Sequence, residues 1–193
     1  MNEMLHIITP AYRYHLLEKV YRSIPLHPDI VWHIVKTSRR EKIAGEFLND
    51  SRVRLYEIDV ADSDTISKRN YVFEHIKDGY FFLLDDDTIF MSAAYDCYRH
   101  YAGINFVGMV IGAQAHRNMN IRLRPTYPEE NLSIDSGNVI SHFSVLGQVK
   151  WEWTPPNSQD TRDFIFWNNC FKYFGKGKTE ITPEIISVYN FLN

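Results

Sequence analysis

Five apolar residues, Tyr80 to Leu84, run directly into three consecutive aspartates, Asp85, Asp86 and Asp87. A short, unbroken apolar run that is rich in aromatic residues indicates a strand buried on both faces, as in a parallel sheet. In open α/β sheets, ligands bind beyond the carboxyl ends of such strands. The sequence therefore predicts a core strand that delivers three carboxylates to a binding site.

Three adjacent carboxylates repel one another unless water or a cation neutralises them. Hard oxygen ligands of this kind suit Mg²⁺ or Mn²⁺, and Mg²⁺ is typically held by one or two carboxylates together with substrate phosphates. The stretch therefore predicts Mn²⁺ or Mg²⁺ as a cofactor. A solvated acidic turn after a core strand is the alternative interpretation.

The composition is that of an ordinary globular protein. The chain has 193 residues, of which 45% are hydrophobic and 23% charged, and this length favours a single domain. A net charge of −3 gives no basic footprint for nucleic acid. We expect no signal peptide and no transmembrane segment, because no apolar stretch reaches about 18 residues. Cys97 and Cys170 are expected to be structural thiols in a reducing compartment.

Strand and helix patterns alternate in the first half of the chain. The apolar runs predict strands at 5–8, 30–35, 53–58 and 80–84, and helical spacing predicts helices at 14–24, 43–48 and from 67 to near Gly79. This alternation is typical of a right-handed parallel α/β sheet.

The second half of the chain has a less regular pattern. It predicts helices at 93–102, 158–171 and 182–191, strands at 106–111, 134–140 and 149–153, and a polar loop or irregular hairpin at 114–131. Long ordered loops in compact domains are often functional.

Four short motifs, in this order, resemble those of GT-A glycosyltransferases. Ile8–Tyr12, after the first strand, resembles their opening, and Lys68–Asn70 resembles the Arg-Asn step that begins one of their helices. Asp85–Asp87 resembles their Asp-x-Asp motif in a form similar to that of glucuronyltransferase-like and family-2-like enzymes. Ser158–Asp160 is similar to their Glu-Asp catalytic step, with Gln in place of Glu.

The resemblance implies an α/β, GT-A-like fold with a mostly parallel sheet flanked by helices. The single domain 1–193 would comprise a nucleotide-binding half, 1–91, and an acceptor-side half, 92–193. The implied partners are a nucleotide-sugar donor, in most such families a UDP-sugar, and a saccharide or lipid-linked saccharide acceptor. The implied setting is the cytoplasm, with peripheral attachment to the inner membrane as a further option.

The resemblance also implies roles for individual residues. The nucleotide would be bound by residues after the first and fourth strands, in the acidic loop and at the start of the following helix, namely Thr9, Pro10, Ala11, Tyr12, Asp62 (or Asp59), Arg69, Asp85 and Asp86. Asp87 would be the main metal ligand, with Asp85 beside it. His142 is a further candidate ligand, because some related enzymes use a downstream histidine.

The expected reaction is a metal-dependent, inverting glycosyl transfer. A divalent cation stabilises the diphosphate leaving group, and the acceptor hydroxyl needs a general base within hydrogen-bond reach. The candidate bases are Asp160, Asp163 and Asp135. The first two could instead favour a helix N-terminus, and Asp135 could instead make a turn with Gly137.

Three other interpretations of the same stretch exist. A haloacid-dehalogenase-type phosphatase would use an Asp-x-Asp-x-Thr motif, but the fifth position here is Ile89 and three strand patterns precede it. A nucleotidyltransferase would need a glycine-rich loop after the first strand, and residues 12–15 contain no glycine. A non-catalytic nucleotide- or sugar-binding domain remains as the alternative to an enzyme, because the Glu of the catalytic step is absent.

Overall fold

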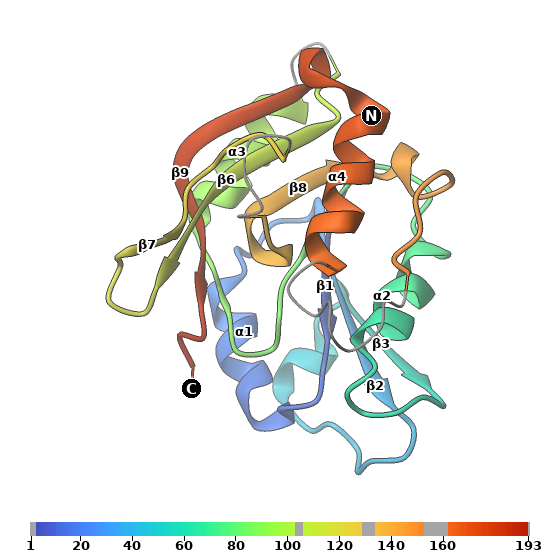
Figure 1. Ribbon diagram of the computed structural model, residues 1–193. Helices are drawn as coiled ribbons and strands as arrows, with labels where there is room; N and C mark the ends of the chain where they lie inside the picture. Colours follow the sequence, from blue (N-terminus) through green and yellow to red (C-terminus); the bar gives the residue numbers. More distant parts are fainter. Residues whose placement is uncertain (1–2, 103–105, 129–133, 153–161, 193) are drawn as a thin grey trace.

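The computed structural model describes residues 3–102, 106–128, 134–152 and 162–192. One nine-stranded sheet runs through these residues in the order β3-β2-β1-β4-β8-β6-β9-β5, and β7 pairs with β6 beside this path (Figure 1). None of the described helices is long and apolar enough to cross a membrane.

The N-terminal half of the sheet is parallel, as the alternation of patterns predicted. Its four strands are β1 (Leu5–Pro10), β2 (Ile30–Thr37), β3 (Val53–Ile58) and β4 (Tyr80–Leu83). The connections carry helices α1 (Leu17–Ser23) and α2 (Thr65–Phe73) and the 3-10 turns Tyr14–Leu16 and Glu46–Asn49. The carboxyl ends of these strands therefore meet at one edge of the sheet.

The second half of the sheet is mixed. Its strands are β5 (Ile89–Phe90), β6 (Met109–His116), β7 (Ile121–Leu123), β8 (Val139–His142) and β9 (Thr179–Tyr189). Strand β8 runs antiparallel between β4 and β6, whereas β9 runs parallel to β6 and antiparallel to β5. Helices α3 (Ser92–Ala102) and α4 (Arg162–Phe174) complete the fold.

The predicted helix at 182–191 is wrong, because this segment belongs to strand β9. Four β-branched residues of this strand, Thr179, Ile181, Ile185 and Val188, pair in register with β6, and Val188 also pairs with β5. The register with β6 shifts between Ile111 and Ala113, opposite a stretch that contains Pro183. Proline is tolerated in strands at such bulges, and the bulge breaks the strict alternation that would have indicated a strand.

Other predicted boundaries also differ from the structure. The strand predicted at 106–111 begins at Met109 and continues to His116, into the hairpin with β7. The segment 134–140 contains a 3-10 turn, Ser136–Asn138, before β8, and residues 149–152 form no strand. The predicted start of the late helix, at Ser158, lies outside the described residues.

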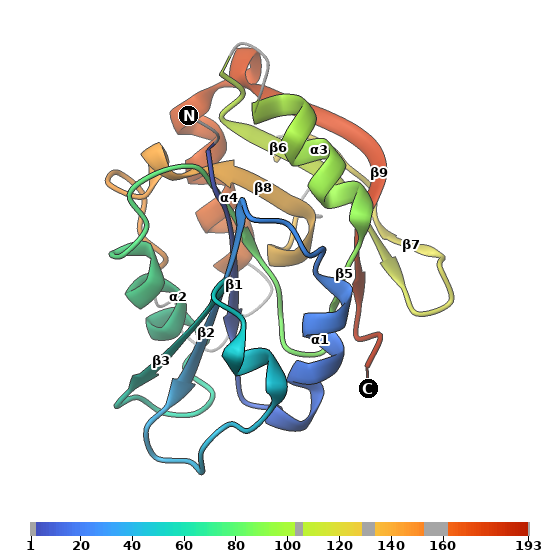
Figure 2. The ribbon, with the colours of Figure 1, turned by 180° about the vertical axis from the view of Figure 1, so that it is seen from behind.

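The core forms two layers, one on each face of the sheet. Strand β4 contributes to both, because alternate residues of a strand face opposite sides. Tyr80 and Phe82 pack with α1 and α3, while Phe81 and Leu83 pack with α2 and α4. Figure 1 shows α2 and α4 on one face, and Figure 2 shows α1 and α3 on the other. The prediction that this strand is buried on both faces is confirmed.

The two cysteines lie in different layers of the core. Cys97 of α3 packs in one layer and Cys170 of α4 in the other, and both thiols are free and buried. Burial raises the pKa of each thiol. The prediction of structural thiols agrees with these positions.

A chain of hydrogen bonds crosses the parallel strands on one face. His6 Nδ1 lies 3.0 Å from His33 Nε2, and His33 Nδ1 lies 3.2 Å from the Tyr56 hydroxyl. Burial, with the neighbouring His6 second, lowers the pKa of His33 to about 3. The imidazole of His33 is therefore neutral in the folded protein at ordinary pH.

We expect this histidine to make the protein less stable in mild acid. Between pH 6.5 and about 3 the unfolded chain protonates His33 and the folded chain does not, so stability falls as the pH is lowered through this range, by up to about 1.4 kcal/mol per pH unit. Urea unfolding of the wild type and of His33→Phe at pH 7.5 and pH 5.0 measures this loss. The variant should lose less stability than the wild type, and an equal loss in both proteins would contradict the assignment.

Candidate active site

The three consecutive aspartates lie at the carboxyl end of β4, and each has different partners. Asp86 is fully buried, and its carboxylate accepts hydrogen bonds from the backbone N–H groups of Tyr12 and Arg13, both at 2.7 Å. The Arg13 Nε–H donates to its other oxygen, also at 2.7 Å. Asp86 therefore holds the loop after β1 against the end of β4.

We expect Asp86 to be essential for folding rather than for chemistry alone. Asp86→Ala would leave the backbone N–H groups of Tyr12 and Arg13 without their acceptor and would remove one of the two carboxylates that pair with the Arg13 guanidinium. Removing one member of a buried ion pair costs about 3 kcal/mol or more. Urea unfolding at pH 7 measures this cost. Asp59→Ala, which breaks the exposed ion pair with Arg39, is the control and should change stability little.

Asp85 and Asp87, on either side of Asp86, differ in their exposure and in their partners. Asp85 accepts a hydrogen bond from Arg69 of α2 at 3.0 Å, and its side chain is 34% exposed. Asp87 is almost fully buried and pairs with the Arg13 guanidinium. Desolvation of its partly buried carboxylate raises the pKa of Asp85, and repulsion from the other carboxylates acts in the same direction, against the opposing charge of Arg69. The backbone N–H of Leu192, which follows β9, donates to the backbone carbonyl of Asp87 at 3.2 Å.

Arg69 connects this carboxylate loop to a second pair of aspartates. Its guanidinium lies 3.7 Å from the Asp163 carboxylate, in the first turn of α4, and stacks 4.6 Å from the Trp151 ring. The backbone N–H of Ser136 donates to both Asp135 and Asp163, at 2.6 and 3.1 Å. Two of the three predicted bases thus face each other within reach of the carboxylate loop.

The two facing aspartates have different protonation behaviour. Burial, reinforced by Asp135, raises the pKa of Asp163 to about 7 against the opposing charge of Arg69. Burial acts on Asp135 too, but its hydrogen bond with the Asp163 carboxyl and its ion pair with Arg122, at 2.5 Å, lower its pKa overall. Asp163 therefore has the protonation behaviour of a general base that works near neutral pH. Asp160, the third candidate, lies outside the described residues.

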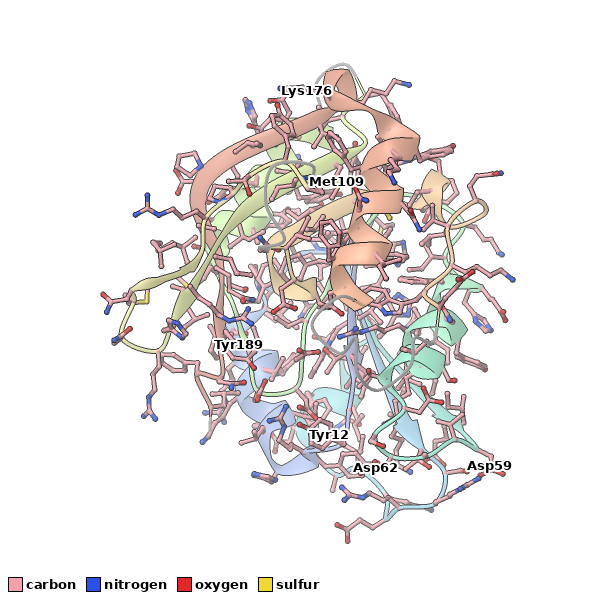
Figure 3. All side chains as sticks on the ribbon, viewed as in Figure 1. Tyr12, Asp59, Asp62, Met109, Lys176 and Tyr189 are labelled. Atoms are coloured by element: carbon pink, nitrogen blue, oxygen red, sulfur yellow. The ribbon has the colours of Figure 1, made fainter. Side chains whose placement is uncertain are left out.

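The predicted nucleotide-binding loop after β1 is largely buried. Thr9 and Pro10, the last residues of β1, and the following Ala11 are buried, and the Thr9 hydroxyl already accepts a hydrogen bond from Trp32 Nε1 at 2.9 Å. Only the partly exposed Tyr12 offers a side chain to a ligand. Figure 3 shows Tyr12 and Asp62 together at the carboxyl end of the parallel strands, far from Met109 and Lys176.

Asp62 and Tyr14 offer polar atoms that suit a nucleoside. Asp62 Oδ1 and the Tyr14 hydroxyl are buried and accept or donate no hydrogen bond within the described residues. Nearby, Lys68 is fully buried and donates to the backbone carbonyls of Ala11 and Asp62, at 2.9 and 2.6 Å. Asp59 lies further out, in its exposed pair with Arg39.

The structure adds Arg13 and Lys68 to the predicted site residues, and it places Arg122 of the polar segment beside Asp135. Each is a cation that joins segments far apart in the sequence, so its role depends on contacts that short motifs do not contain. For Lys68, the signal was its adjacency to Arg69 in the Lys-Arg-Asn motif. Burial lowers the pKa of Lys68.

The prediction of His142 as a metal ligand is wrong. His142 pairs in register with Tyr80, at the start of β4, and its Nε2 lies 3.5 Å from the Glu3 carboxylate. Asp85 is five residues beyond Tyr80, which is roughly 16 Å at the usual rise of a strand. His142 and Asp87 therefore lie at opposite ends of the strand and cannot share a cation.

Asp85 and Asp87 suit a divalent cation only if a bound substrate supplies further ligands to it. Among the described residues, no group of three or more His, Cys, Asp or Glu side chains is arranged to hold a metal ion. Asp85 and Asp87 supply hard oxygen atoms, and one or two carboxylates with substrate phosphates are a usual set for Mg²⁺. The residues present fit a cation shared with a bound diphosphate.

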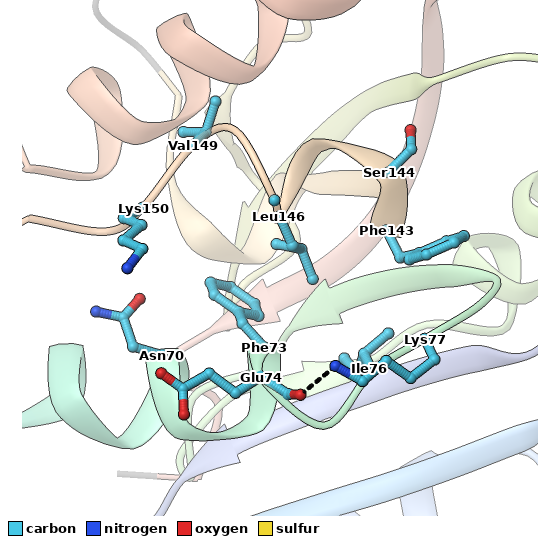
Figure 4. Close-up of a pocket in the computed structure, with 11 residues that line it drawn as sticks. Asn70, Phe73, Glu74, Ile76, Lys77, Phe143, Ser144, Leu146, Val149 and Lys150 are labelled. Carbon is cyan, nitrogen blue, oxygen red and sulfur yellow. Dashed lines mark hydrogen bonds between the residues drawn. The ribbon is translucent and has the colours of Figure 1, made fainter.

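A cavity of about 440 Å³ lies beside this site rather than in it (Figure 4). Its walls are mainly apolar and are formed by the end of α2 with the residues that follow it, 70–77, and by the segment 143–150, with Phe73, Ile76 and Leu146 among them. Asn70 lines the cavity and donates to the Trp151 carbonyl at 2.9 Å. None of Asp85, Asp86 and Asp87 lines it.

No family model matches the chain, and no curated protein sequence matches it. Solved structures do match its fold. The fragment 1–349 of TarS from S. aureus has a TM-score of 0.75 at 10% sequence identity, over 96% of this chain and 60% of that chain. The same fragment in complex with UDP-GlcNAc also has a TM-score of 0.75 at 10% identity, over 96% and 58% of the two chains.

The structure of a mannosyltransferase matches as well. The mannosyltransferase PcManGT from Pyrobaculum calidifontis, in complex with GDP-Man and Mn²⁺, has a TM-score of 0.68 at 13% identity, over 98% of this chain and 57% of that chain. The chain thus spans less than two thirds of the structures that it matches. At these identities the likeness establishes the fold, and the GT-A-like α/β fold implied by the motifs is confirmed.

Proposed function

We propose that this chain is a metal-dependent glycosyltransferase that moves a sugar from a nucleotide-diphosphate donor, first of all a UDP-sugar, to a hydroxyl acceptor with inversion. The chain shares its fold with solved structures of complexes with UDP-GlcNAc and with GDP-Man and Mn²⁺. The acceptor that we propose is a saccharide or a lipid-linked saccharide.

One observation carries this proposal. Arg69 lies between the carboxylate loop and a candidate base, 3.0 Å from Asp85 on one side and 3.7 Å from Asp163 on the other. A donor diphosphate held near Asp85 and Asp87 would therefore place its sugar close to a carboxyl group that can accept a proton. An arginine at this position also suits phosphate recognition.

The donor side is assigned to residues of the first 91 positions. Asp62 and Tyr12 would contact the nucleoside, and Asp85 and Asp87 would hold the cation shared with the diphosphate. Such a cation supplies Lewis-acid stabilisation of the leaving diphosphate. Asp62 Oδ1 lies 3.8 Å from Lys68 Nζ and accepts no hydrogen bond within the described residues, which supports a hydrogen bond to it from the base or the ribose.

The acceptor side is assigned to the residues after position 91. Asp163 would take the proton of the acceptor hydroxyl as its oxygen attacks the anomeric carbon. The bond from that carbon to the diphosphate oxygen breaks in the same step, and the nucleoside diphosphate leaves with the bonding electrons. A single displacement of this kind inverts the anomeric configuration.

The test is a calorimetric titration of UDP, GDP and ADP into the protein, with Mn²⁺ and with a chelator. We expect tight binding of one diphosphate, most tightly UDP, only when metal is present. Absence of binding under every condition would contradict the proposal. Tight binding without turnover of any sugar donor would instead favour a non-catalytic nucleotide-binding domain.

A further inference from the structure

Arg13 is the charged partner of two of the three aspartates. Its Nε–H donates to Asp86 at 2.7 Å, its terminal nitrogen pairs with Asp87, and its guanidinium stacks 4.3 Å from the Tyr12 ring. The Arg13 side chain is 23% exposed, whereas those of Asp86 and Asp87 are 0% and 2% exposed. Within the described residues, Arg13 thus pairs with two buried carboxylates from the accessible side of the loop, and the Thr88 hydroxyl also donates to Asp87, at 3.4 Å.

The two aspartates depend on Arg13 to different degrees. Asp86 also accepts hydrogen bonds from two backbone N–H groups, so it stays in place when the guanidinium moves. Asp87 is the aspartate to which we assign the divalent cation. A guanidinium and a divalent cation that contact the same carboxylate repel each other strongly at a site with little water. Arg13 and the cation therefore compete for Asp87.

A donor diphosphate would change the outcome of this competition. Guanidinium groups bind phosphate oxygens through paired, charge-assisted hydrogen bonds. Because the Arg13 side chain is partly exposed at the edge of the carboxylate loop, a diphosphate bound there offers it a new partner. The Asp87 carboxylate is then available to the cation that the same diphosphate binds.

We propose that Arg13 is the resident counterion of Asp87 and makes binding of the divalent cation conditional on the nucleotide diphosphate. This inference rests on the proposed function, since it names the ligand that displaces Arg13. It makes Arg13 a positioning residue that couples two ligands. Such coupling is reciprocal, so metal and diphosphate strengthen each other's binding by the same factor.

The test measures Mn²⁺ binding alone, by electron paramagnetic resonance, for the wild type, Arg13→Gln and Arg13→Lys. Arg13→Gln removes the charge but keeps the backbone N–H donors to Asp86. We expect it to bind Mn²⁺ about tenfold more tightly than the wild type, within the usual range of coupling between sites. Arg13→Lys, which keeps the charge, should bind Mn²⁺ as weakly as the wild type. The matched control is Arg22→Gln, on the 75% exposed arginine of α1, which should change nothing.

A second measurement separates this role from a purely structural one. With Mn²⁺ present, Arg13→Gln should bind UDP about tenfold more weakly, so that the two affinities change in opposite directions. If Arg13 only holds the loop, both affinities fall, and that result would overturn the inference, as would unchanged Mn²⁺ binding. Failure of the wild type to bind any nucleoside diphosphate would count against the proposed function, while the Mn²⁺ measurement alone still tests the counterion role.

Discussion

Asp87→Asn should abolish the metal-dependent binding of nucleoside diphosphate. The variant removes the charge that we assign to the cation but keeps the volume of the side chain at a site that is almost fully buried. A cation that bridges protein and diphosphate contributes several kcal/mol, so we expect UDP affinity in the presence of Mn²⁺ to fall about a hundredfold or more. Calorimetric titration with and without a chelator measures the effect.

The control for this variant is Asp96→Asn. Asp96 is an exposed aspartate on α3, which covers the face of the sheet opposite α2 and α4. It should bind UDP like the wild type. Retention of tight, Mn²⁺-dependent binding by Asp87→Asn would refute the assignment of the metal to this residue. The far-ultraviolet circular dichroism of both variants shows whether each one is folded.

Asp163→Asn should lower kcat strongly and leave the affinity for the donor nucleotide almost unchanged. General bases contribute about 10²–10⁴-fold to rate, so we expect kcat to fall by this factor while the affinity for UDP with Mn²⁺ changes little. The rate of the wild type should rise with pH through about 7, the pKa of Asp163, since the carboxyl group must lose its proton before it can accept another.

Asp160→Asn and Asp135→Asn are the companion variants in the same assay. If Asp163 is the base, Asp135→Asn should retain activity but shift the rise in rate to lower pH, because the neighbouring negative charge that raises the pKa of Asp163 is gone. A larger loss of kcat in Asp160→Asn than in Asp163→Asn would move the role of base to Asp160.

The parallel half of the sheet could be predicted from the sequence because its signals are local. The unbroken apolar run before Asp85 indicates burial on both faces, and the structure places its residues in both layers of the core. Strand β9 could not be predicted in this way. Its pattern is irregular because of the bulge near Pro183, and its pairing with β6 and β5 depends on segments far away in the chain.

The location of the site could be predicted, but the division of roles among its aspartates could not. Three identical residues in a row give no local signal of which one is structural. Asp86 takes that role only because the loop after β1 brings two N–H groups and Arg13 to it. His142 was misplaced for a related reason, since its position depends on the antiparallel register of β8 against β4.

The hydrogen bond from the Leu192 backbone N–H to the Asp87 carbonyl connects the residues after β9 directly to the aspartate loop, although the two segments are far apart in the sequence. Strand β5, directly after the aspartates, also pairs with β9 at Val188 and Ser187. Sequence changes at 186–192 can therefore tilt the aspartate loop without touching a substrate. When variants of this chain are classified for loss of activity, those in this segment belong with the active-site class and not with the tolerated surface changes.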